Sequence, residues 1–165
     1  MTTDRRRFLL SAGLGALGVA LLGSCGGSGA EAAERFPVQM SAAEWRRKLG
    51  PAAFAVLREA ATERPFSSPL DDEHRAGTFL CKGCDNPLYS SKTKFDSGTG
   101  WPSFWAPLPH AIVTRTDRSL LIARTEVRCA RCGGHLGHVF DDGPPPTGKR
   151  YCMNGLAMVF RPGKG

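Results

Sequence analysis

The sequence predicts a mainly β protein built on antiparallel sheet, with short N-terminal helices packed outside it and a structural metal site. Three observations carry this prediction. Beyond residue 66, short apolar runs recur at intervals of roughly ten residues between Gly, Pro and Asp turns. Helical spacing of apolar residues is confined to 41–62. Two Cys-x-x-Cys pairs lie within the strand-rich part of the chain.

Length and net charge restrict the domain organisation and the functions that this chain can have. The chain has 165 residues, of which 41% are hydrophobic and 22% charged, so we expect one globular domain with an appendage. Its formal net charge of +7 is spread along the chain without a concentrated basic run. Because nucleic-acid binders usually gather their basic residues, we expect no nucleic-acid partner. We also expect a monomer.

The first 25 residues have the organisation of an export signal. Three arginines at 5–7 precede an apolar run over 8–23, which is shorter than the about 20 residues of a membrane-spanning helix. Residues 4–9 resemble a twin-arginine signal, which exports proteins already folded. We therefore expect a bacterial protein of the periplasm or cell envelope.

Two cleavage positions fit this signal. Residues 22–25 resemble a lipobox, in which Cys25 would be lipidated and become the mature N-terminus. Residues 30–32 instead form an A-x-A site for ordinary cleavage. The small and polar segment 26–40 predicts a flexible tether, followed by one domain over 41–165.

The start of that domain predicts two short helices. Ser41 and Glu44 form a capping box, and apolar residues recur at helical spacing over 42–49 and 51–62, interrupted at Gly50. Beyond the helices, short apolar runs bounded by turn residues predict strands. These strands cover residues 77–81, 86–89, 111–114, 120–123, 138–140 and 157–160.

Four cysteines in two Cys-x-x-Cys pairs predict a structural zinc site. Each pair directs two thiolates to one centre, and two pairs complete the tetrahedral sulfur set that suits Zn²⁺, with no position left open for catalysis. Two short disulfides, or a redox Cys-x-x-Cys, are the alternatives. A redox pair should open a helix after a strand, a setting that neither pair has. The four residues are Cys81, Cys84, Cys129 and Cys132.

Cys152 lies outside these pairs. A lone cysteine is most often a small core residue, but Arg150 lies two residues away, where its charge would favour the thiolate. His135 and His138 lie upstream, and a strand returning through Cys152 would pass beside them. Gly137 could supply the bend that brings both histidines into one pocket.

The segment 97–104 is the other dense motif. Its glycines allow an unusual backbone path, and Trp101 and Phe104 offer apolar rings. A turn leading into a core aromatic would have the same sequence. Beside a nucleophilic thiol, such rings would form a wall suited to a methyl group or a thioether.

Taken together, these blocks resemble the B-type methionine sulfoxide reductases in their zinc-containing form. The resemblance rests on residues 98–104, 134–144 and 150–154, in the family's order, and covers residues 41–161. It implies two antiparallel sheets with helices outside. It also implies reduction of the R epimer of methionine sulfoxide in proteins, through a sulfenic acid on the nucleophile.

The resemblance assigns a role to each site residue. Cys152 matches the nucleophile. His135 and His138 match the histidines that bind and protonate the sulfoxide oxygen, and Asp142 matches the acid that orients them. Trp101 matches the ring that holds the substrate methyl group. The other predicted substrate-binding residues are Phe104, Arg150 and Asn154.

One position departs from the family pattern. Many members carry a resolving cysteine two residues before the pocket tryptophan, where this sequence has Thr99. The usual disulfide with Cys152 cannot form there, so we expect an external thiol of thioredoxin type to reduce the sulfenic acid. Two other functions fit parts of the sequence. They are a zinc-stabilised binding module, which would leave Cys152 inert, and a thiol–disulfide exchange protein.

Overall fold

The computed structural model describes residues 34–120 and 122–163. In that part of the chain, one helix precedes nine strands and two 3-10 helices. The elements are α1 (Ala42–Glu59), β1 (Gly77–Cys81), β2 (Pro87–Ser90), η1 (Ser91–Thr93), β3 (Lys94–Phe95), β4 (Ser103–Phe104), β5 (Ile112–Asp117), β6 (Arg124–Cys129), β7 (His135–Phe140), β8 (Arg150–Met153), η2 (Gly155–Ala157) and β9 (Met158–Pro162).

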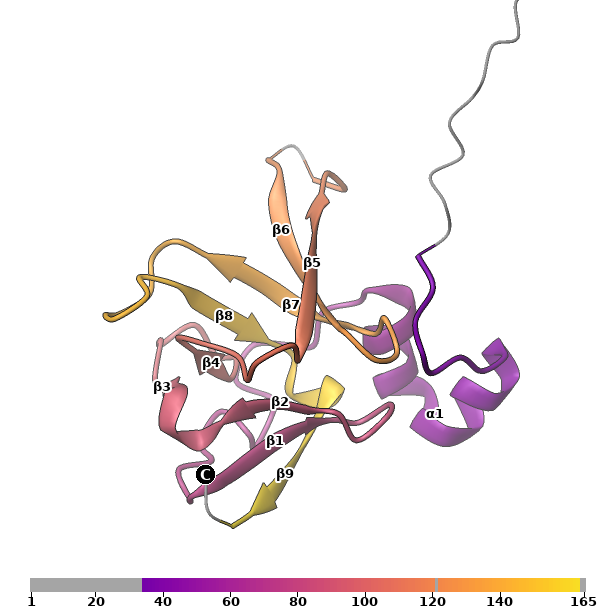
Figure 1. The fold of residues 1–165 in the computed structure, drawn as a ribbon, viewed down its shortest axis with the longest axis horizontal. Helices are drawn as coiled ribbons and strands as arrows, with labels where there is room; N and C mark the ends of the chain where they lie inside the picture. The colour runs from indigo at the N-terminus through magenta and orange to yellow at the C-terminus, as the bar shows by residue number, and fades with distance from the viewer. Residues whose placement is uncertain (1–33, 121, 164–165) are drawn as a thin grey trace, which may run out of the picture. The chain divides into compact units, whose positions relative to one another are not determined.

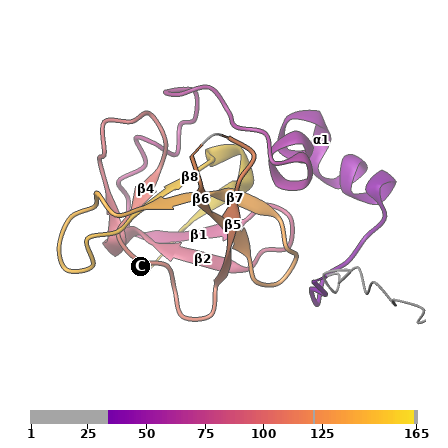
Figure 2. The same ribbon diagram turned by 90° about the horizontal axis from the view of Figure 1, so that it is seen from above.

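The strands form two antiparallel sheets, which confirms the predicted fold class. The smaller sheet has the order β2-β1-β9, and the larger has the order β3-β4-β8-β7-β6-β5. Figure 1 shows the smaller sheet below the larger one, and Figures 1 and 2 both show α1 to one side of the sheets. The helix therefore packs outside the β structure, as predicted.

Aromatic side chains join the two sheets. The ring of Phe104 on β4 stacks on Tyr89 of β2, with centroids 4.3 Å apart, and meets Phe79 of β1 edge-on at 4.9 Å. The Tyr89 hydroxyl donates to the sulfur of Met153 at 3.1 Å. Such aromatic pairs contribute about 0.5–1.5 kcal/mol each beyond their area burial. This core fixes β4 and β8, the strands that carry the functional segment.

Helix α1 has the start and the interruption that its sequence predicts. The Ser41 amide donates to the Glu44 carboxylate at 2.8 Å, and the Glu44 amide donates to the Ser41 hydroxyl at 3.3 Å. Gly50 has φ 72°, a left-handed conformation that costs glycine little, so the helix is kinked there. The helix ends at Glu59 rather than at 62, because Ala60 is left-handed with φ 55°.

The described residues of the predicted strand 120–123, which are 120 and 122–123, do not lie in a strand, contrary to prediction. Asp117 pairs with Arg124 as the last register pair of the β5–β6 hairpin, so the described residues between them, 118–120 and 122–123, belong to its tip. Leu120 and Ile122 are 59% and 77% exposed there. An apolar run becomes a core strand only where the topology gives it a surface to cover, and a hairpin tip has none.

The C-terminal part of the predicted tether is packed on the domain. The Val38 amide donates to the Arg131 carbonyl at 2.8 Å, the Phe36 ring lies 4.8 Å from the Arg128 guanidinium, and Glu34 pairs with Arg128 at 2.6 Å. These contacts join residues 34–38 to the domain, and the predicted tether over 26–40 stays a prediction. The predicted export signal and Cys25 lie outside the described residues. Within the described residues, no helix is long and apolar enough to cross a membrane.

Candidate active site and metal site

The four paired cysteines meet in one buried cluster. Their sulfur atoms all lie within 4.8 Å of one another. The shortest contacts join the two pairs: Cys81 and Cys132 sulfurs are 3.7 Å apart, and Cys84 and Cys129 sulfurs are 3.5 Å apart. A disulfide needs about 2.05 Å. The cysteines are therefore unbonded thiols gathered around one centre.

This cluster fits a tetrahedral metal ion. A sulfur-to-metal distance of about 2.3 Å would separate tetrahedral sulfurs by about 3.8 Å, close to the observed contacts. The Asn86 side-chain amide points at the Cys129 sulfur, 3.6 Å away, as a donor stabilising a thiolate would. Because Cys81 ends β1 and Cys129 ends β6, a bound metal would link the two sheets.

Helix α1 covers this metal-binding cluster. The Arg58 guanidinium donates to the Cys132 carbonyl at 2.9 Å and lies over the Trp45 ring at 4.8 Å. Trp45 and Leu57 are almost completely buried. The cysteines thus lie beneath helix and sheet, away from solvent, as a structural site requires.

Cys152 occupies the middle of the larger sheet. Its strand β8 runs between β7 and β4, so that Cys152 is the register partner of His138 on one side and of Ser103 on the other. Directly opposite residues in an antiparallel pair place their side chains on the same face. The expectation that a returning strand brings this cysteine beside a histidine is confirmed.

That face opens into a cavity of about 130 Å³. Apolar rings form part of its wall, and a thiol, an imidazole, an amide and a guanidinium also face it. This mixture suits a small ligand with an apolar end and one polar atom. The lining residues are Thr62, Trp101, Arg124, Gly137, His138, Phe140, Cys152 and Asn154.

Burial raises the pKa of the Cys152 thiol above its ordinary value. A contact with the Thr99 hydroxyl and the charge of Arg150 lower that pKa, but they offset only part of the effect. The sequence predicts correctly that Arg150 favours the thiolate. Desolvation is the larger effect, so the resting cysteine is protonated at neutral pH.

Asp142 does not have the contacts predicted for it. Its carboxylate accepts two hydrogen bonds from Arg150, at 2.9 and 2.8 Å, and it bonds to neither histidine. The Arg150 guanidinium also lies 4.5 Å from the Phe140 ring. Register explains the pairing, because Phe140 and Arg150 are opposite each other where β7 and β8 meet. Asp142 therefore positions Arg150 and does not orient the histidines.

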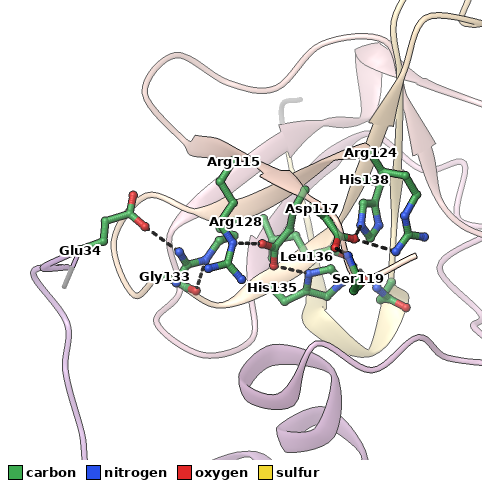
Figure 3. Close-up of polar contacts among 12 residues, drawn as sticks. Glu34, Arg115, Asp117, Ser119, Arg124, Arg128, Gly133, His135, Leu136 and His138 are labelled. Atoms are coloured by element: carbon green, nitrogen blue, oxygen red, sulfur yellow. Dashed lines mark hydrogen bonds and ion pairs between the residues drawn. The ribbon is translucent and has the colours of Figure 1, made fainter. Parts of the chain in front are cut away.

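The acid that orients His138 is Asp117. Figure 3 shows the Asp117 carboxylate between His138 and Arg124; its Oδ2 lies 2.8 Å from the His138 Nε2 and 2.7 Å from the Arg124 guanidinium. Hydrogen bonds from Ser119, His138 and Arg124 hold the pKa of Asp117 well below its usual range. Burial lowers the pKa of His138, and Asp117 offsets only part of this, so the imidazole is neutral at pH 7.

His135 does not share the cavity. Its ring centroid lies 5.4 Å from that of His138, but it lines a second, smaller cavity with Glu126 and Arg115. The His135 Nδ1 meets the Glu126 carboxylate at 2.7 Å, and Arg115 donates to the other carboxylate oxygen (Figure 3). Burial would raise the pKa of Glu126, but these two bonds outweigh it and lower that pKa. Gly137 thus does not bring both histidines into one pocket.

Trp101 and Asn154 lie where the sequence predicts them, on the cavity wall. The indole Nε1 donates to the Glu63 carbonyl at 3.2 Å, which fixes the ring plane. The Asn154 amide donates to the Leu136 carbonyl at 3.0 Å and accepts from the Glu63 amide at 3.0 Å. Both side chains are therefore positioned by the segment that follows α1.

Phe104 is a core residue and not a substrate contact, contrary to prediction. It is fully buried between Tyr89 and Phe79. Ser103 and Phe104 are neighbours on β4, so their side chains point to opposite faces. Because Ser103 faces Cys152, Phe104 must face the core.

Several site residues have no signal in the sequence. Asp117, Glu126 and Arg124 stand in no motif, and only the pairing of three strands brings them to the histidines. Glu63 follows the helix in a polar stretch, and its buried carboxylate accepts the Leu156 amide at 2.8 Å. Burial raises the pKa of Glu63. An acid before a turn, such as Asp117, reads from sequence as ordinary turn chemistry.

Fold and site together define a class: β proteins that hold a buried four-cysteine cluster and, apart from it, a partly exposed cysteine that faces a histidine in a cavity. The model of the SelR domain matches residues 49–162 of this chain. The match covers both cysteine pairs and every residue of the cavity. The chain belongs to the SelR domain family.

Named relatives agree with this membership. The chain is 53% identical over 126 residues to "Peptide methionine sulfoxide reductase MsrB" of Agrobacterium fabrum, covering 76% of this chain and 93% of the relative. It is 57% identical over 120 residues to the protein of that name from Bradyrhizobium diazoefficiens, covering 72% and 86%. The Pseudomonas putida protein of the same name is 54% identical over 123 residues, covering 74% and 92%.

Proposed function

We infer that this protein is an oxidoreductase that reduces the R epimer of methionine sulfoxide in polypeptides, a peptide-methionine (R)-S-oxide reductase. One observation carries the conclusion. Cys152 is the cross-strand partner of His138 within a cavity walled by Trp101. Reduction of a methyl sulfoxide needs a nucleophilic thiol, a group that moves a proton and an apolar surface for the methyl group.

In the first step the Cys152 sulfur attacks the sulfoxide sulfur and forms a bond to it, while the thiol proton passes to the sulfoxide oxygen. The hydroxyl then moves from the substrate sulfur to the Cys152 sulfur, and the bond between the two sulfurs breaks. The products are methionine and a cysteine sulfenic acid. The substrate sulfur gains two electrons and the cysteine sulfur loses them, so the step needs no other reductant.

His138 is suited to relay that proton. An ionised carboxylate only accepts, so the His138 Nε2 that faces Asp117 carries its hydrogen, and Nδ1 is the nitrogen free to exchange a proton. A protonated thiol beside a neutral imidazole is the resting state that both pKa directions favour. Asp117 stabilises the imidazolium formed during transfer.

The remaining residues of the site support the reaction of Cys152 and His138. Trp101 provides the ring against which a methyl group packs, and Arg150 lowers the cost of thiolate formation. Asn154 lies on the same wall. His135 lies edge-on to the His138 ring and lines the neighbouring cavity. We therefore propose that it holds the His138 ring in place rather than contacting the substrate oxygen.

An external thiol completes the cycle. In the described residues, the cysteines other than Cys152 are buried together in the metal-binding cluster. Two thiols return the sulfenic acid to a thiol, releasing water and a disulfide. We propose a thioredoxin-like protein as the donor in the cell and oxidised, methionine-containing proteins as substrates, so that the enzyme repairs oxidative damage as a monomer.

The metal of the four-cysteine cluster is proposed to be Zn²⁺. The spacing of the sulfurs, the set of four cysteines and their burial support it, since zinc prefers a closed tetrahedral set of thiolates in structural sites. Zinc would supply no catalytic chemistry here, because all four positions are taken by protein. Its ligands would be Cys81, Cys84, Cys129 and Cys132.

Export is proposed on sequence alone. The arginines at 5–7 and the apolar run over 8–23 support a twin-arginine signal over 1–25, and a mature domain that includes 41–165. Export after folding would let the metal load in the cytoplasm. Mass spectrometry of the mature N-terminus distinguishes a lipidated Cys25 from a cut after residue 32.

Turnover of the two separated sulfoxide epimers tests the function. With dithiothreitol as reductant, the protein is expected to reduce a peptide containing the R epimer and to leave the S epimer unchanged. Cys152→Ser, which is nearly isosteric, should lower the rate by several orders of magnitude, as for other essential nucleophiles. Residual activity within about tenfold of wild type would refute the assignment of Cys152.

A further inference from the structure

We propose that the active-site cavity continues onto an apolar rim, formed by Phe66, Leu120 and Ile122, that binds the side chains flanking the sulfoxide in a polypeptide. The occupant is an unfolded segment with apolar residues on either side of the oxidised methionine. This inference rests on the proposed function, because it specifies the substrate class of the same site.

The rim residues are the most exposed large apolar side chains among the described residues. Ile122 is 77% exposed, Phe66 73% and Leu120 59%, against 38% or less for Met40 and Val159. Single exposed apolar residues are ordinary on a protein surface. Each of these three lies two to four residues along the chain from a residue that lines the cavity, and the proposed rim groups them at its edge, as interaction sites group apolar residues.

Each rim residue belongs to a segment that also forms the cavity wall. Phe66 follows Thr62, which lines the cavity, by four residues, and Ile122 precedes Arg124, which also lines it, by two. The Phe66 amide donates to the Gly100 carbonyl at 2.7 Å, next to Trp101. Two separate segments of the chain therefore carry exposed apolar residues close in sequence to residues of the cavity wall.

Phe66 is held in place at an energetic cost. Its φ is 59°, a left-handed conformation that is rare for a bulky residue and is retained where the surrounding structure enforces it. A Cβ added to Gly100 would lie 2.8 Å from the Phe66 ring, so the ring covers that glycine. The fold thus keeps Phe66 in a strained backbone conformation in which its ring is exposed to solvent beside Gly100, the neighbour of Trp101. A ligand-binding role accounts for that arrangement.

The hairpin tip is tied to the catalytic histidine. Asp117 accepts the Ser119 amide at 2.9 Å and the Arg124 guanidinium at 2.7 Å, which fixes both ends of the tip that carries Leu120 and Ile122. The same carboxylate holds His138. Figure 1 shows the β5–β6 hairpin projecting beyond the rest of the larger sheet, where a long polypeptide can reach it.

The size of the cavity explains why flanking residues need a surface. At about 130 Å³ it accepts little more than one side chain, so the rest of a polypeptide must lie outside it. Methionine usually lies among apolar neighbours in a protein core. Once such a core segment unfolds, these neighbours are exposed with the sulfoxide, and burying them on an apolar rim is favourable.

Three substrates distinguish the contribution of the rim to substrate binding from that of the cavity. They are N-acetyl-methionine-R-sulfoxide amide, a pentapeptide with leucines flanking the R-sulfoxide, and the same pentapeptide with serines. With full-length protein and dithiothreitol, we expect kcat/KM about tenfold higher for the leucine peptide than for the serine peptide. The double variant Leu120→Ser/Ile122→Ser should remove most of this preference and leave turnover of the blocked amino acid unchanged.

Phe66→Asn tests the other part of the rim. Asparagine tolerates the left-handed backbone, so the variant removes the ring without adding strain. It should also reduce the preference for the leucine peptide, by about threefold to tenfold. Val159→Ser is the matched control, since it removes an exposed aliphatic side chain from β9, outside the cavity wall. That control should retain the full preference.

The possible outcomes distinguish failure of the proposed function from failure of the proposed rim. If wild type reduces none of the three substrates, the proposed function fails and the rim fails with it. If wild type reduces all three but treats the two peptides equally, only the rim is overturned. A preference that survives in both rim variants, each with unchanged turnover of the blocked amino acid, also overturns the rim alone.

Discussion

The hydroxyl oxygen of Thr99 lies 3.8 Å from the sulfur of Cys152. Thr99 also shares a hydrogen bond with Ser97 at 2.8 Å, and Ser97 shares another with Ser103 at 2.7 Å, so a chain of hydroxyls runs beside the thiol. The position where many relatives of this family type carry a resolving cysteine is thus within reach of the nucleophile. What it lacks is the second sulfur.

Thr99→Cys should therefore install an internal disulfide. After one turnover with excess substrate, wild type is expected to lose one thiol and to hold a sulfenic acid that dimedone traps. The variant should lose two thiols and become a better thioredoxin substrate, because thioredoxin reduces disulfides fastest. Thiol counting and peptide mapping measure this. Thr99→Ser, which adds no sulfur, is the control, and a Cys152 disulfide in wild type would contradict the prediction.

Alkylation of Cys152 should be slow at neutral pH and should rise with pH. Burial raises its pKa, so less thiolate is present at pH 7 than for an ordinary cysteine near 8.5. Arg150 lowers that pKa, so Arg150→Gln should shift the midpoint further upward. The iodoacetamide rate from pH 6 to 10, compared with a cysteine peptide, measures both. A wild-type midpoint below that of the peptide would refute the protonated resting state.

Asp117→Asn should impair proton transfer at His138. The amide can still accept from Nε2, but it carries no charge to stabilise an imidazolium, so kcat should fall about tenfold to a hundredfold. Since Asp117 raises the pKa of His138, that pKa should fall further, which NMR titration of the ring reports. Asp142→Asn is the matched control and should leave the His138 titration in place. The reverse pattern would restore the role predicted for Asp142 from sequence.

Cys84→Ser should release the metal and lower the melting temperature sharply. Thiolate binding of a structural zinc contributes on the order of 10 kcal/mol to folding in small domains, and this site links β1 to β6. Elemental analysis and thermal unfolding measure the two effects. Cys152→Ser should keep both metal and melting temperature. Intact protein that contains no metal and two disulfides would show that the zinc assignment is wrong.

Substitutions of Phe104 should affect mainly the stability of the fold, and substitutions of Trp101 mainly the activity. Phe104→Ala removes a fully buried ring and should cost about 3–5 kcal/mol of unfolding free energy. Phe104→Leu, a milder change that stays folded, should retain kcat/KM on a blocked amino acid. Trp101→Leu should instead lower kcat/KM with a small change in stability. If Phe104→Leu raises KM about tenfold, the residue contacts substrate after all.

Local spacing was sufficient for much of this protein. Two Cys-x-x-Cys pairs predicted the metal-binding cluster, because a thiolate pair at that spacing already points to one centre. Ser41 and Glu44 predicted the start of α1, and Gly50 its interruption, since capping and left-handed backbone are properties of neighbouring residues. The returning strand beside His138 followed from a turn between two short apolar segments.

Long-range pairing decided what spacing could not. Asp117 reaches His138 from β5 across β6, and Asp142, though nearer in sequence, is taken by Arg150 through the β7–β8 register. Phe104 faces the core because its neighbour faces Cys152, an alternation that depends on which strands flank β4.

The predicted strand 120–123 shows the same limit. Its apolar composition predicted a strand, but the Asp117–Arg124 pair places its described residues, 120 and 122–123, in a hairpin tip. The sequence by itself determined which chemistry the chain carries: a thiol nucleophile, histidines and a four-cysteine cluster. Only the tertiary structure decided which acid serves which histidine and which apolar residues face water. Those outcomes depend on contacts between strands far apart in the chain, and no local pattern encodes their register.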